Sequence, residues 1–192
     1  TGDWTSHQTP VTNHMPLIVL EGPEGAGKTT QIALLAKRLA SRGRVVSLRE
    51  PGGRPLGHDV RRVLLDPKSD VSPNAEALLY MASRAQLVQR EVAPAIAAGA
   101  IVLLDRFFLS TYAYQVAGRG LSEALVVSAN RLATADLRPD VTILLTLPVE
   151  EGLARAKSRG GHDRIEQADA AFHRRVAHAF TEFATPAWQA SH

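Results

Sequence analysis

Short apolar runs alternate with longer segments of helical periodicity along most of the chain. Four runs are almost wholly apolar, as expected for parallel strands buried on both faces, and they predict strands at residues 17–21, 45–48, 101–104 and 141–147. Helices are predicted at residues 28–42, 58–65, 74–98, 122–135, 150–159 and 168–182, with Pro94 expected to kink the longest of them. This alternation predicts an α/β fold with a central parallel sheet flanked by helices.

The length and composition suit one soluble domain. The chain has 192 residues, of which 45% are apolar and 21% charged. Residues 1–14 are polar and aperiodic and lack the features of a secretory signal, so we expect a disordered leader or extension before a single domain at residues 15–192. No apolar run is long enough to span a bilayer. The absence of cysteine fits a reducing cytoplasm, where we place the protein.

The net charge of +3 raises the possibility of a nucleic-acid-binding protein. The arginines are scattered, however, and no basic block with interleaved aromatic residues is present. Arginines that bind the phosphates of mononucleotides would give the same charge balance. We therefore expect neither nucleic acid nor a membrane as a partner.

The stretch GPEGAGKTT follows the first predicted strand and leads into a helix, and it fits the phosphate-binding P-loop pattern. Its glycines let the backbone turn so that N–H groups face phosphate oxygens. Lys28 is expected to reach the β- and γ-phosphates of ATP, and the Thr29 hydroxyl to bind Mg²⁺. The predicted ATP-binding residues are Gly22, Pro23, Glu24, Gly25, Ala26, Gly27, Lys28 and Thr29.

Three further segments follow the other predicted strands, and ligands of such sheets collect at the carboxyl ends of the strands. They are REPGGR, DRFFLSTYAYQ and SRGGHDR. Asp105 is a candidate partner of Mg²⁺, and Arg106 can bind a phosphate bidentately. The basic segment 155–164 is predicted to be a mobile lid, with Arg159 as the arginine that the P-loop itself lacks. Read alone, this segment also fits a solvated surface loop.

Taken together, these motifs resemble those of thymidylate kinases, from Leu17 to about Phe183. The segments that carry the resemblance are EGPEGAGKTT, REPGG, Tyr80 to Arg84, DRFFLSTYAYQ, GRG, RPD and RGGHDRIE. The resemblance implies the nucleoside monophosphate kinase type of P-loop NTPase fold and transfer of a phosphoryl group from ATP–Mg²⁺ to dTMP. It also implies a homodimer. Because Glu24 stands where one type of family member has an arginine, the chain resembles the type whose catalytic arginine lies in the lid.

The resemblance also implies roles for individual residues. The catalytic set is Lys28, Arg106 and Arg159, and Mg²⁺ is held by Thr29 and Asp105. Arg84 and Arg106 bind the acceptor phosphate, Tyr80 stacks on thymine, and Tyr114 crowds the 2′ position of the sugar. The full implied dTMP site is Glu24, Arg49, Pro51, Leu56, Tyr80, Arg84, Arg106, Thr111, Tyr114 and Gln115.

Three features depart from the family pattern. Phe107 stands where the family usually has Tyr or His, and Arg54 stands where Thr is usual, close to the expected acceptor site. The family's closing strand and helix are expected to be absent after residue 192, which leaves an edge of the sheet unpaired. Two alternatives therefore remain: a P-loop kinase for another acceptor such as dUMP, and a nucleotide-binding module without turnover.

Overall fold

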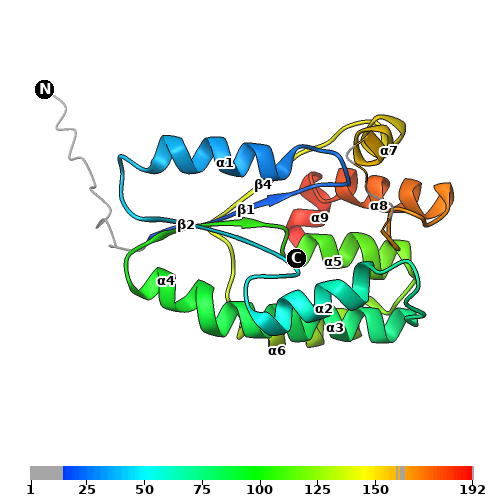
Figure 1. Cartoon of the computed structure of the whole chain (residues 1–192), viewed down its shortest axis with the longest axis horizontal. Coiled ribbons are helices and arrows are strands. Elements are labelled where there is room, and N and C mark those ends of the chain that lie inside the picture. Colours follow the sequence, from blue (N-terminus) through cyan, green and yellow to red (C-terminus); the bar gives the residue numbers. More distant parts are fainter. Residues whose placement is uncertain (1–14, 159, 161–162, 192) are drawn as a thin grey trace, which may run out of the picture.

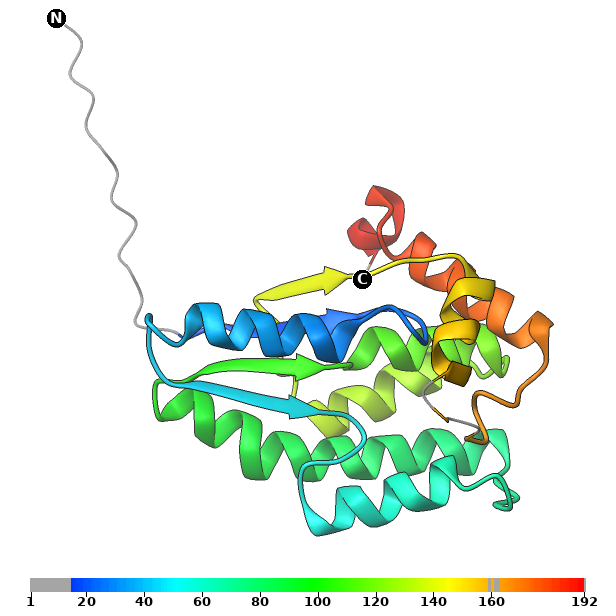
Figure 2. The same ribbon diagram turned by 45° about the horizontal axis from the view of Figure 1, so that its top comes forward.

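The fold is built on a four-stranded parallel sheet. The computed structural model describes residues 15–158, 160 and 163–191. Strands β1 (Leu17–Glu21), β2 (Val45–Arg49), β3 (Ile101–Asp105) and β4 (Val141–Leu144) are arranged in the order β2-β3-β1-β4. All neighbouring pairs are parallel, and the arrows in Figure 2 point the same way, toward the end of the molecule that carries the P-loop. The predicted α/β fold is confirmed.

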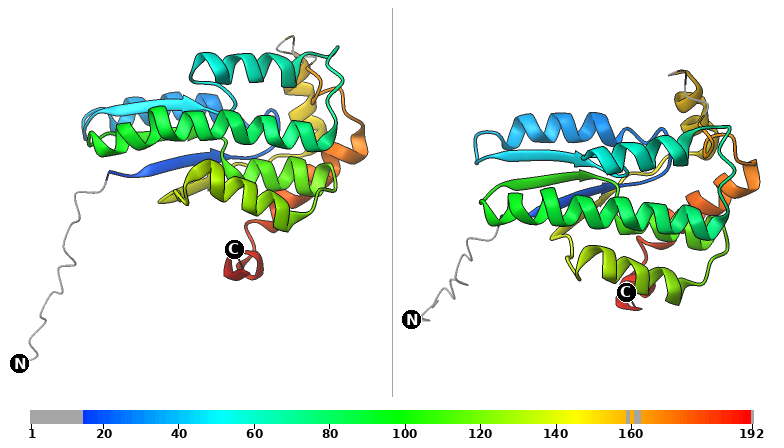
Figure 3. Two further views of the ribbon diagram at one scale, coloured as in Figure 1. Left: turned by 90° about the horizontal axis from the view of Figure 1, so that it is seen from below. Right: turned by 60° about the horizontal axis from the view of Figure 1, so that its bottom comes forward.

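Helices cover both faces of the sheet. Helix α1 (Lys28–Leu39) packs on one face through Ile32, which contacts Leu20 and Leu103. The opposite face is covered by the continuous segment formed by α3 (Pro73–Leu87), the π-helix η1 (Val88–Val92) and α4 (Ala93–Ala97). Figure 1 and the right-hand view of Figure 3 show the order α1, sheet, α3 with α4, and then α6 (Glu123–Thr134) outermost.

The strands differ in burial according to their place in the sheet. Every residue of the central β3 is buried, whereas β4 is largely exposed because it pairs only with β1. The prediction that this strand reaches residue 147 is wrong, since it ends at Leu144. Its partner β1 ends at Glu21, where the chain turns into the P-loop, so later residues have no strand to pair with.

The long predicted helix is interrupted near Pro94. Proline has no N–H to donate to the carbonyl of Arg90, four residues earlier. The N–H of the preceding residue, Ala93, bonds the carbonyl of Val88, five residues back, which is the π-helical spacing. The Arg90 carbonyl accepts a hydrogen bond from Arg54 Nη2 at 3.4 Å. The interruption therefore gives the loop after β2 an anchoring point on this helix.

The segment DRFFLSTYAYQ is helical from Phe108 onward, although no helix was predicted there. It forms α5 (Phe108–Thr111) and the π-helix η2 (Tyr112–Gly118). Its aromatic residues pack against α8 (Ala170–Glu182), where Phe172 and Phe180 flank Tyr114. Because this packing depends on a partner more than fifty residues away, local periodicity did not reveal it.

The remaining helices frame the same end of the molecule. Helix α2 (Pro55–Leu65) begins three residues earlier than predicted, with proline at its first position. Helix α7 (Val149–Ser158) precedes α8, and the short α9 (Pro186–Ser191) was not predicted. Within the described residues, no helix has both the length and the apolar character needed to cross a bilayer.

Candidate functional site

The P-loop connects β1 to α1 through a backbone that only glycine adopts easily. Gly22, Gly25 and Gly27 have φ angles of 142°, 73° and 85°, in the left-handed region. A Cβ atom at Gly25 would lie 2.3 Å from the carbonyl oxygen of Gly152 in α7. Glycine is therefore required at this position for both its conformation and its close contact with α7.

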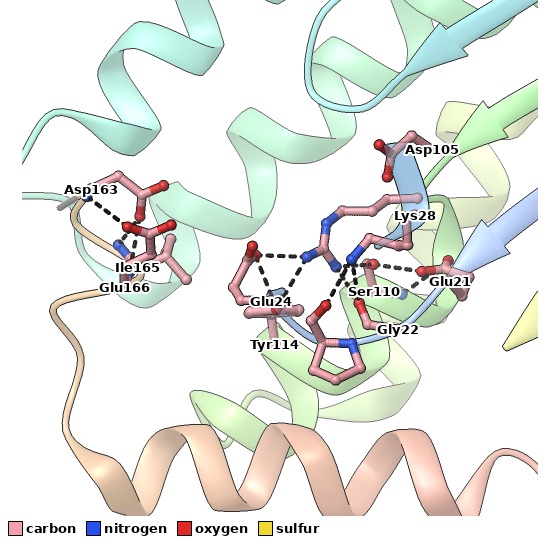
Figure 4. Close-up of polar contacts among 12 residues, drawn as sticks. Glu21, Gly22, Glu24, Lys28, Asp105, Ser110, Tyr114, Asp163, Ile165 and Glu166 are labelled. Atoms are coloured by element: carbon pink, nitrogen blue, oxygen red, sulfur yellow. Dashed lines mark hydrogen bonds and ion pairs between the residues drawn. The ribbon is translucent and has the colours of Figure 1, made fainter. Parts of the chain in front are cut away.

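Lys28 lies buried inside the loop and is held by carbonyl groups. Its Nζ donates to Gly22 O at 2.9 Å and to Pro23 O at 2.8 Å (Figure 4). Burial, and to a smaller extent the positive charge of Arg106, lower the pKa of Lys28 to about 7. The charge of Lys28 in the free protein is therefore sensitive to pH in the neutral range, and a phosphate ligand would stabilise its charged form.

The oxygen ligands expected for Mg²⁺ lie next to each other. Thr29 Oγ1 donates to Asp105 Oδ2 at 2.7 Å, which joins the first turn of α1 to the end of β3. A hydroxyl and a carboxylate are hard oxygen donors of the kind that Mg²⁺ uses together with substrate phosphates. The two residues thus fit the predicted ion. Among the described residues, no group of three or more His, Cys, Asp or Glu side chains is arranged to hold a metal by itself.

Arg106 occupies the centre of the site in a strained backbone conformation, with φ of 71°. Its Nη1 donates to Gly22 O at 2.9 Å and to Ser110 Oγ at 3.0 Å. Its Nη2 pairs with Glu24 Oε1 at 2.6 Å, and the same carboxylate oxygen accepts a hydrogen bond from the Tyr114 hydroxyl at 3.3 Å. Arg106, Glu24 and Tyr114, three of the predicted site residues, therefore form one cluster.

A buried carboxylate that the sequence analysis did not single out supports this cluster. Glu21 Oε1 accepts hydrogen bonds from the backbone N–H groups of Phe107 and Ser110, at 2.8 and 3.1 Å. Its Oε2 accepts from Ser110 Oγ at 2.6 Å. Glu21 thereby fixes the turn after β3 from which Arg106 projects. The available signal was an acidic residue at the end of an otherwise apolar strand.

Arg84 differs from Arg106, because acceptors within the protein bind the hydrogen-bond donors of its guanidinium group. Its side chain is 2% exposed, and its Nη2 and Nε bind Glu50 Oε2 at 2.7 and 2.8 Å. The remaining contacts are Nη2 to Phe107 O at 3.0 Å, Nη1 to Asn130 Oδ1 at 2.7 Å and Nη1 to Met81 Sδ at 3.9 Å. These contacts engage all five donors of the side chain. This geometry argues against a grip on the acceptor phosphate by Arg84.

A cavity of about 480 Å³ joins these parts, which is within the range of small-molecule sites. Its lining includes predicted residues from helix α3 and from each of the first three converging segments: Glu24, Gly25, Ala26, Gly27, Lys28, Thr29, Arg49, Pro51, Tyr80, Arg84, Asp105, Arg106, Thr111, Tyr114 and Gln115. Gly22 and Pro23 do not line the cavity; their carbonyl groups accept hydrogen bonds from Lys28. Leu56 is not part of the lining and is 47% exposed on α2.

The cavity also contains residues that were not predicted. Arg61 from α2 lies on the lining together with Arg49, and its Nη1 donates to Pro51 O at 3.3 Å. Burial and the nearby Arg49 lower the pKa of Arg61, which indicates a site that would gain from a bound anion. Asp163 and Glu166 lie opposite Glu24 (Figure 4). Neighbouring sequence did not reveal any of these positions, because they reach the cavity through the packing of α2 and the segment before α8.

The predicted lid is described only in part. Helix α7 ends at Ser158, and Arg159 lies outside the described residues, so its predicted catalytic role stays a prediction. Beyond it, Arg164 is anchored by hydrogen bonds from Nε to Leu64 O at 2.9 Å and from Nη2 to Glu76 Oε2 at 2.6 Å. The C-terminal end of the segment 155–164 is thus held against α2 and α3.

The two atypical residues near the acceptor site have structural partners. Arg54 pairs with Glu91 on η1, and it is not among the residues that line the cavity. Phe107 is fully buried, and its ring lies 5.2 Å from the Arg84 guanidinium carbon. Arg54 therefore stays outside the cavity, whereas Phe107 forms part of its lining.

Comparison with known proteins agrees with this geometry. A family model described as thymidylate kinase matches residues 20–190. Curated thymidylate kinases of Deinococcus radiodurans and of Pseudomonas fluorescens strain SBW25 are 53% and 52% identical over 168 and 165 residues. These alignments cover 87% and 85% of this chain and 82% and 79% of the relatives.

A solved structure extends the agreement to the fold. The crystal structure of thymidylate kinase from Ehrlichia chaffeensis superposes with a TM-score of 0.74 at 31% identity, covering 89% of this chain and 85% of that one. The predicted P-loop fold of the nucleoside monophosphate kinase type is therefore confirmed. The chain belongs to the thymidylate kinase family.

Proposed function

We propose that this protein transfers the γ-phosphoryl group of ATP to dTMP and releases dTDP and ADP. The observation that carries the proposal is the cavity of about 480 Å³ in which the P-loop meets the cluster of Arg106, Glu24 and Tyr114. One end of the cavity is suited to a nucleoside triphosphate. The other end is lined by aromatic and polar side chains suited to a nucleoside monophosphate.

Positioning and charge neutralisation are proposed to supply the catalysis. A nucleotide phosphate is ionised near neutral pH, so an oxygen of dTMP attacks the γ-phosphorus without a strong general base. The support for Lys28 and Arg106 as catalytic cations is that both side chains donate to the carbonyl of Gly22 in the P-loop, near the proposed position of the transferred group. Arg159 is proposed as the third cation.

Thr29 and Asp105 are proposed to hold Mg²⁺ together with the phosphates of ATP. The bound ion would neutralise phosphate charge during the transfer. Thr29 and Asp105 are already paired, so the first turn of α1 and the end of β3 are aligned before ATP binds.

The acceptor phosphate is proposed to bind Arg106 with help from Arg49 and Arg61. Arg84 is replaced in this role because Glu50, Asn130 and Phe107 already engage its guanidinium. The predictions that Tyr80 stacks on the base and that Tyr114 restricts the 2′ position are retained. Their support is that both rings line the cavity beside Glu24.

A homodimer is proposed to form through α3 and α6. These helices pack against each other through Met81, Val126 and Ala133. Their outer surface exposes Leu78, Leu125 and Leu132, at 63%, 73% and 83% of their accessible areas. Exposed leucines of this kind on neighbouring helices fit an interface between subunits. The cytoplasmic location stays a prediction from the cysteine-free sequence.

The proposed activity is tested by measuring ADP formation from ATP–Mg²⁺ with dTMP, dUMP, dCMP, dGMP and AMP supplied separately. We expect fast turnover with dTMP. Lys28→Ala should lower kcat by a factor on the order of 10³, because it removes a cation that meets the transferred group, while circular dichroism stays unchanged.

Other outcomes would favour the alternatives. Preferred turnover with dUMP would show a kinase for another acceptor. ATP and dTMP binding without turnover, from folded protein, would show a nucleotide-binding module.

A further inference from the structure

A fully buried carboxylate on α3 connects three segments around the cavity. Glu76 has no exposed surface, and its Oε1 accepts hydrogen bonds from Gln115 Nε2 at 2.9 Å and Arg119 Nε at 3.1 Å. Its Oε2 accepts from Arg119 Nη2 at 3.0 Å and Arg164 Nη2 at 2.6 Å. Neither Glu76 nor Arg119 lines the cavity, whereas Gln115 does. Glu76 therefore acts on any ligand through its neighbours.

The partners of Glu76 keep it ionised. Burial alone would raise the pKa of Glu76, but hydrogen bonds from Arg119, Gln115 and Arg164 outweigh burial and hold that pKa below its ordinary value. An ionised carboxylate has no proton to donate and only accepts hydrogen bonds. The Gln115 side chain must therefore turn its NH₂ group, and not its carbonyl, toward Glu76.

This constraint determines what Gln115 offers to the cavity. Gln115 is 1% exposed, and its Oε1 has no hydrogen-bond partner among the described residues. The side chain can therefore present a carbonyl acceptor and the second N–H of its amide to a ligand. A thymine ring offers the complementary pair, the N3–H donor and a carbonyl acceptor. Cytosine offers the opposite pair along the same edge, an N3 acceptor and an amino donor.

We propose that Glu76 is a positioning residue for base specificity, which locks the amide of Gln115 in the orientation that accepts thymine and rejects cytosine. This inference rests on the proposed function, because it assumes that a nucleoside monophosphate occupies the cavity. Without the carboxylate, the amide can rotate by half a turn and satisfy cytosine. Rejection by a fixed, unmatched polar group is a usual source of large discrimination.

The test is the ratio of kcat/KM for dTMP to kcat/KM for dCMP in the unaltered protein and in Glu76→Gln. The glutamine is close to isosteric but can donate as well as accept, so Gln115 is free to flip. We expect this ratio to fall by about tenfold or more, the value of one good hydrogen bond. Calorimetric binding of dTMP and dCMP should show the same change.

A matched control separates orientation from general damage to the cluster. Arg119→Lys keeps a positive charge beside Glu76, so the carboxylate that faces Gln115 stays ionised although the two-point contact with Arg119 is lost, and the ratio should stay within about threefold of the wild type. Glu76→Gln should also leave the ratio unchanged when it is introduced into Gln115→Ala, because the residue through which it acts is gone. A fall in that background would overturn the proposal.

The inference and the proposed function fail in different ways. If the wild type neither phosphorylates nor binds dTMP, both fall. If it phosphorylates dTMP and the ratio is unchanged in Glu76→Gln, only the role of Glu76 is wrong. Should Glu76→Gln not fold, Glu76→Asp retains the negative charge but moves it away from Gln115. An unchanged ratio in Glu76→Asp would then overturn the inference.

Discussion

Two basic side chains, Lys28 and Arg106, both donate to the carbonyl oxygen of Gly22. The positive charge of each side chain disfavours the protonated form of the other, and burial disfavours the protonated form of both. Burial alone would lower the pKa of Arg106, but Tyr114 and the nearby carboxylates of Glu24, Glu21 and Asp105 outweigh burial and raise that pKa. Lys28 is therefore the member of the pair that titrates near neutral pH.

We expect ATP binding to be accompanied by proton uptake between pH 7 and 8. The pKa of Lys28 is about 7 in the free protein, so Lys28 is mostly neutral above pH 8. The phosphates raise this pKa, so ATP binding protonates Lys28, and affinity should decrease as pH rises above about 7. Calorimetry in buffers of different ionisation enthalpy measures the uptake. Equal uptake in Lys28→Ala would contradict the assignment.

The left-handed backbone of Arg106 predicts a separation of stability from activity. Arg106→Ala and Arg106→Gly should both lose dTMP binding, because both remove the guanidinium. Glycine adopts a φ of 71° without steric cost, so the glycine variant should be more stable than the alanine variant by roughly 1 kcal/mol. Urea unfolding measures the difference, and equal stabilities would argue that the turn relaxes in the variants.

Among the elements, α7 sets the shape of the P-loop by direct backbone contact. Gly152 lies on the buried side of α7, and a Cβ atom there would lie 2.5 Å from the Glu24 carbonyl oxygen. The P-loop pattern does not include Gly152, so only the packing of a later helix reveals its importance. The importance of the π-helical segments η1 and η2 is likewise visible only in the folded chain. Arg54, in the loop after β2, pairs with Glu91 on η1, and η2 packs against α8 through Tyr114.

Gly152→Ala should lower stability by roughly 1–3 kcal/mol, because backbone must move to admit the methyl group. It should also weaken ATP binding, because the added methyl group would displace the P-loop backbone at Glu24 and Gly25. Thermal unfolding and ATP titration check both effects. Ala154→Ser, on the exposed side of the same helix, is the control and should change neither. Unaltered ATP affinity in Gly152→Ala would show that α7 yields instead of the P-loop.

For the molecule as a whole, the sheet separates two different surfaces. The carboxyl ends of the strands carry the cavity, whereas α3 and α6 lie on one side of the sheet (Figure 3). These two helices carry exposed leucines. Helix α3 takes part in both, because Tyr80 and Arg84 line the cavity and Leu78 lies outside.

The proposed homodimer predicts that charges on the outer face of α6 dissociate the subunits. Leu125→Glu combined with Leu132→Glu should convert a dimer to a monomer in sedimentation experiments, because two like charges per subunit would be buried. Leu34→Glu, on the exposed side of α1 and on the opposite face of the sheet, is the control. A wild type that sediments as a monomer, or double variants that remain dimeric, would remove this interface.

The apolar periodicity and the loop motifs were sufficient to predict the parallel sheet, the P-loop and the convergence of loops at one edge. These features depend on residues that are close in sequence. An apolar run followed directly by a motif such as GPEGAGKTT is one example. Arg84, Glu21, Arg61 and Glu76 could not be interpreted in this way. A guanidinium or carboxylate looks the same in a sequence whether protein or ligand satisfies it. The folded chain distinguishes these cases, because burial makes every hydrogen bond of such groups necessary and brings their partners from distant segments.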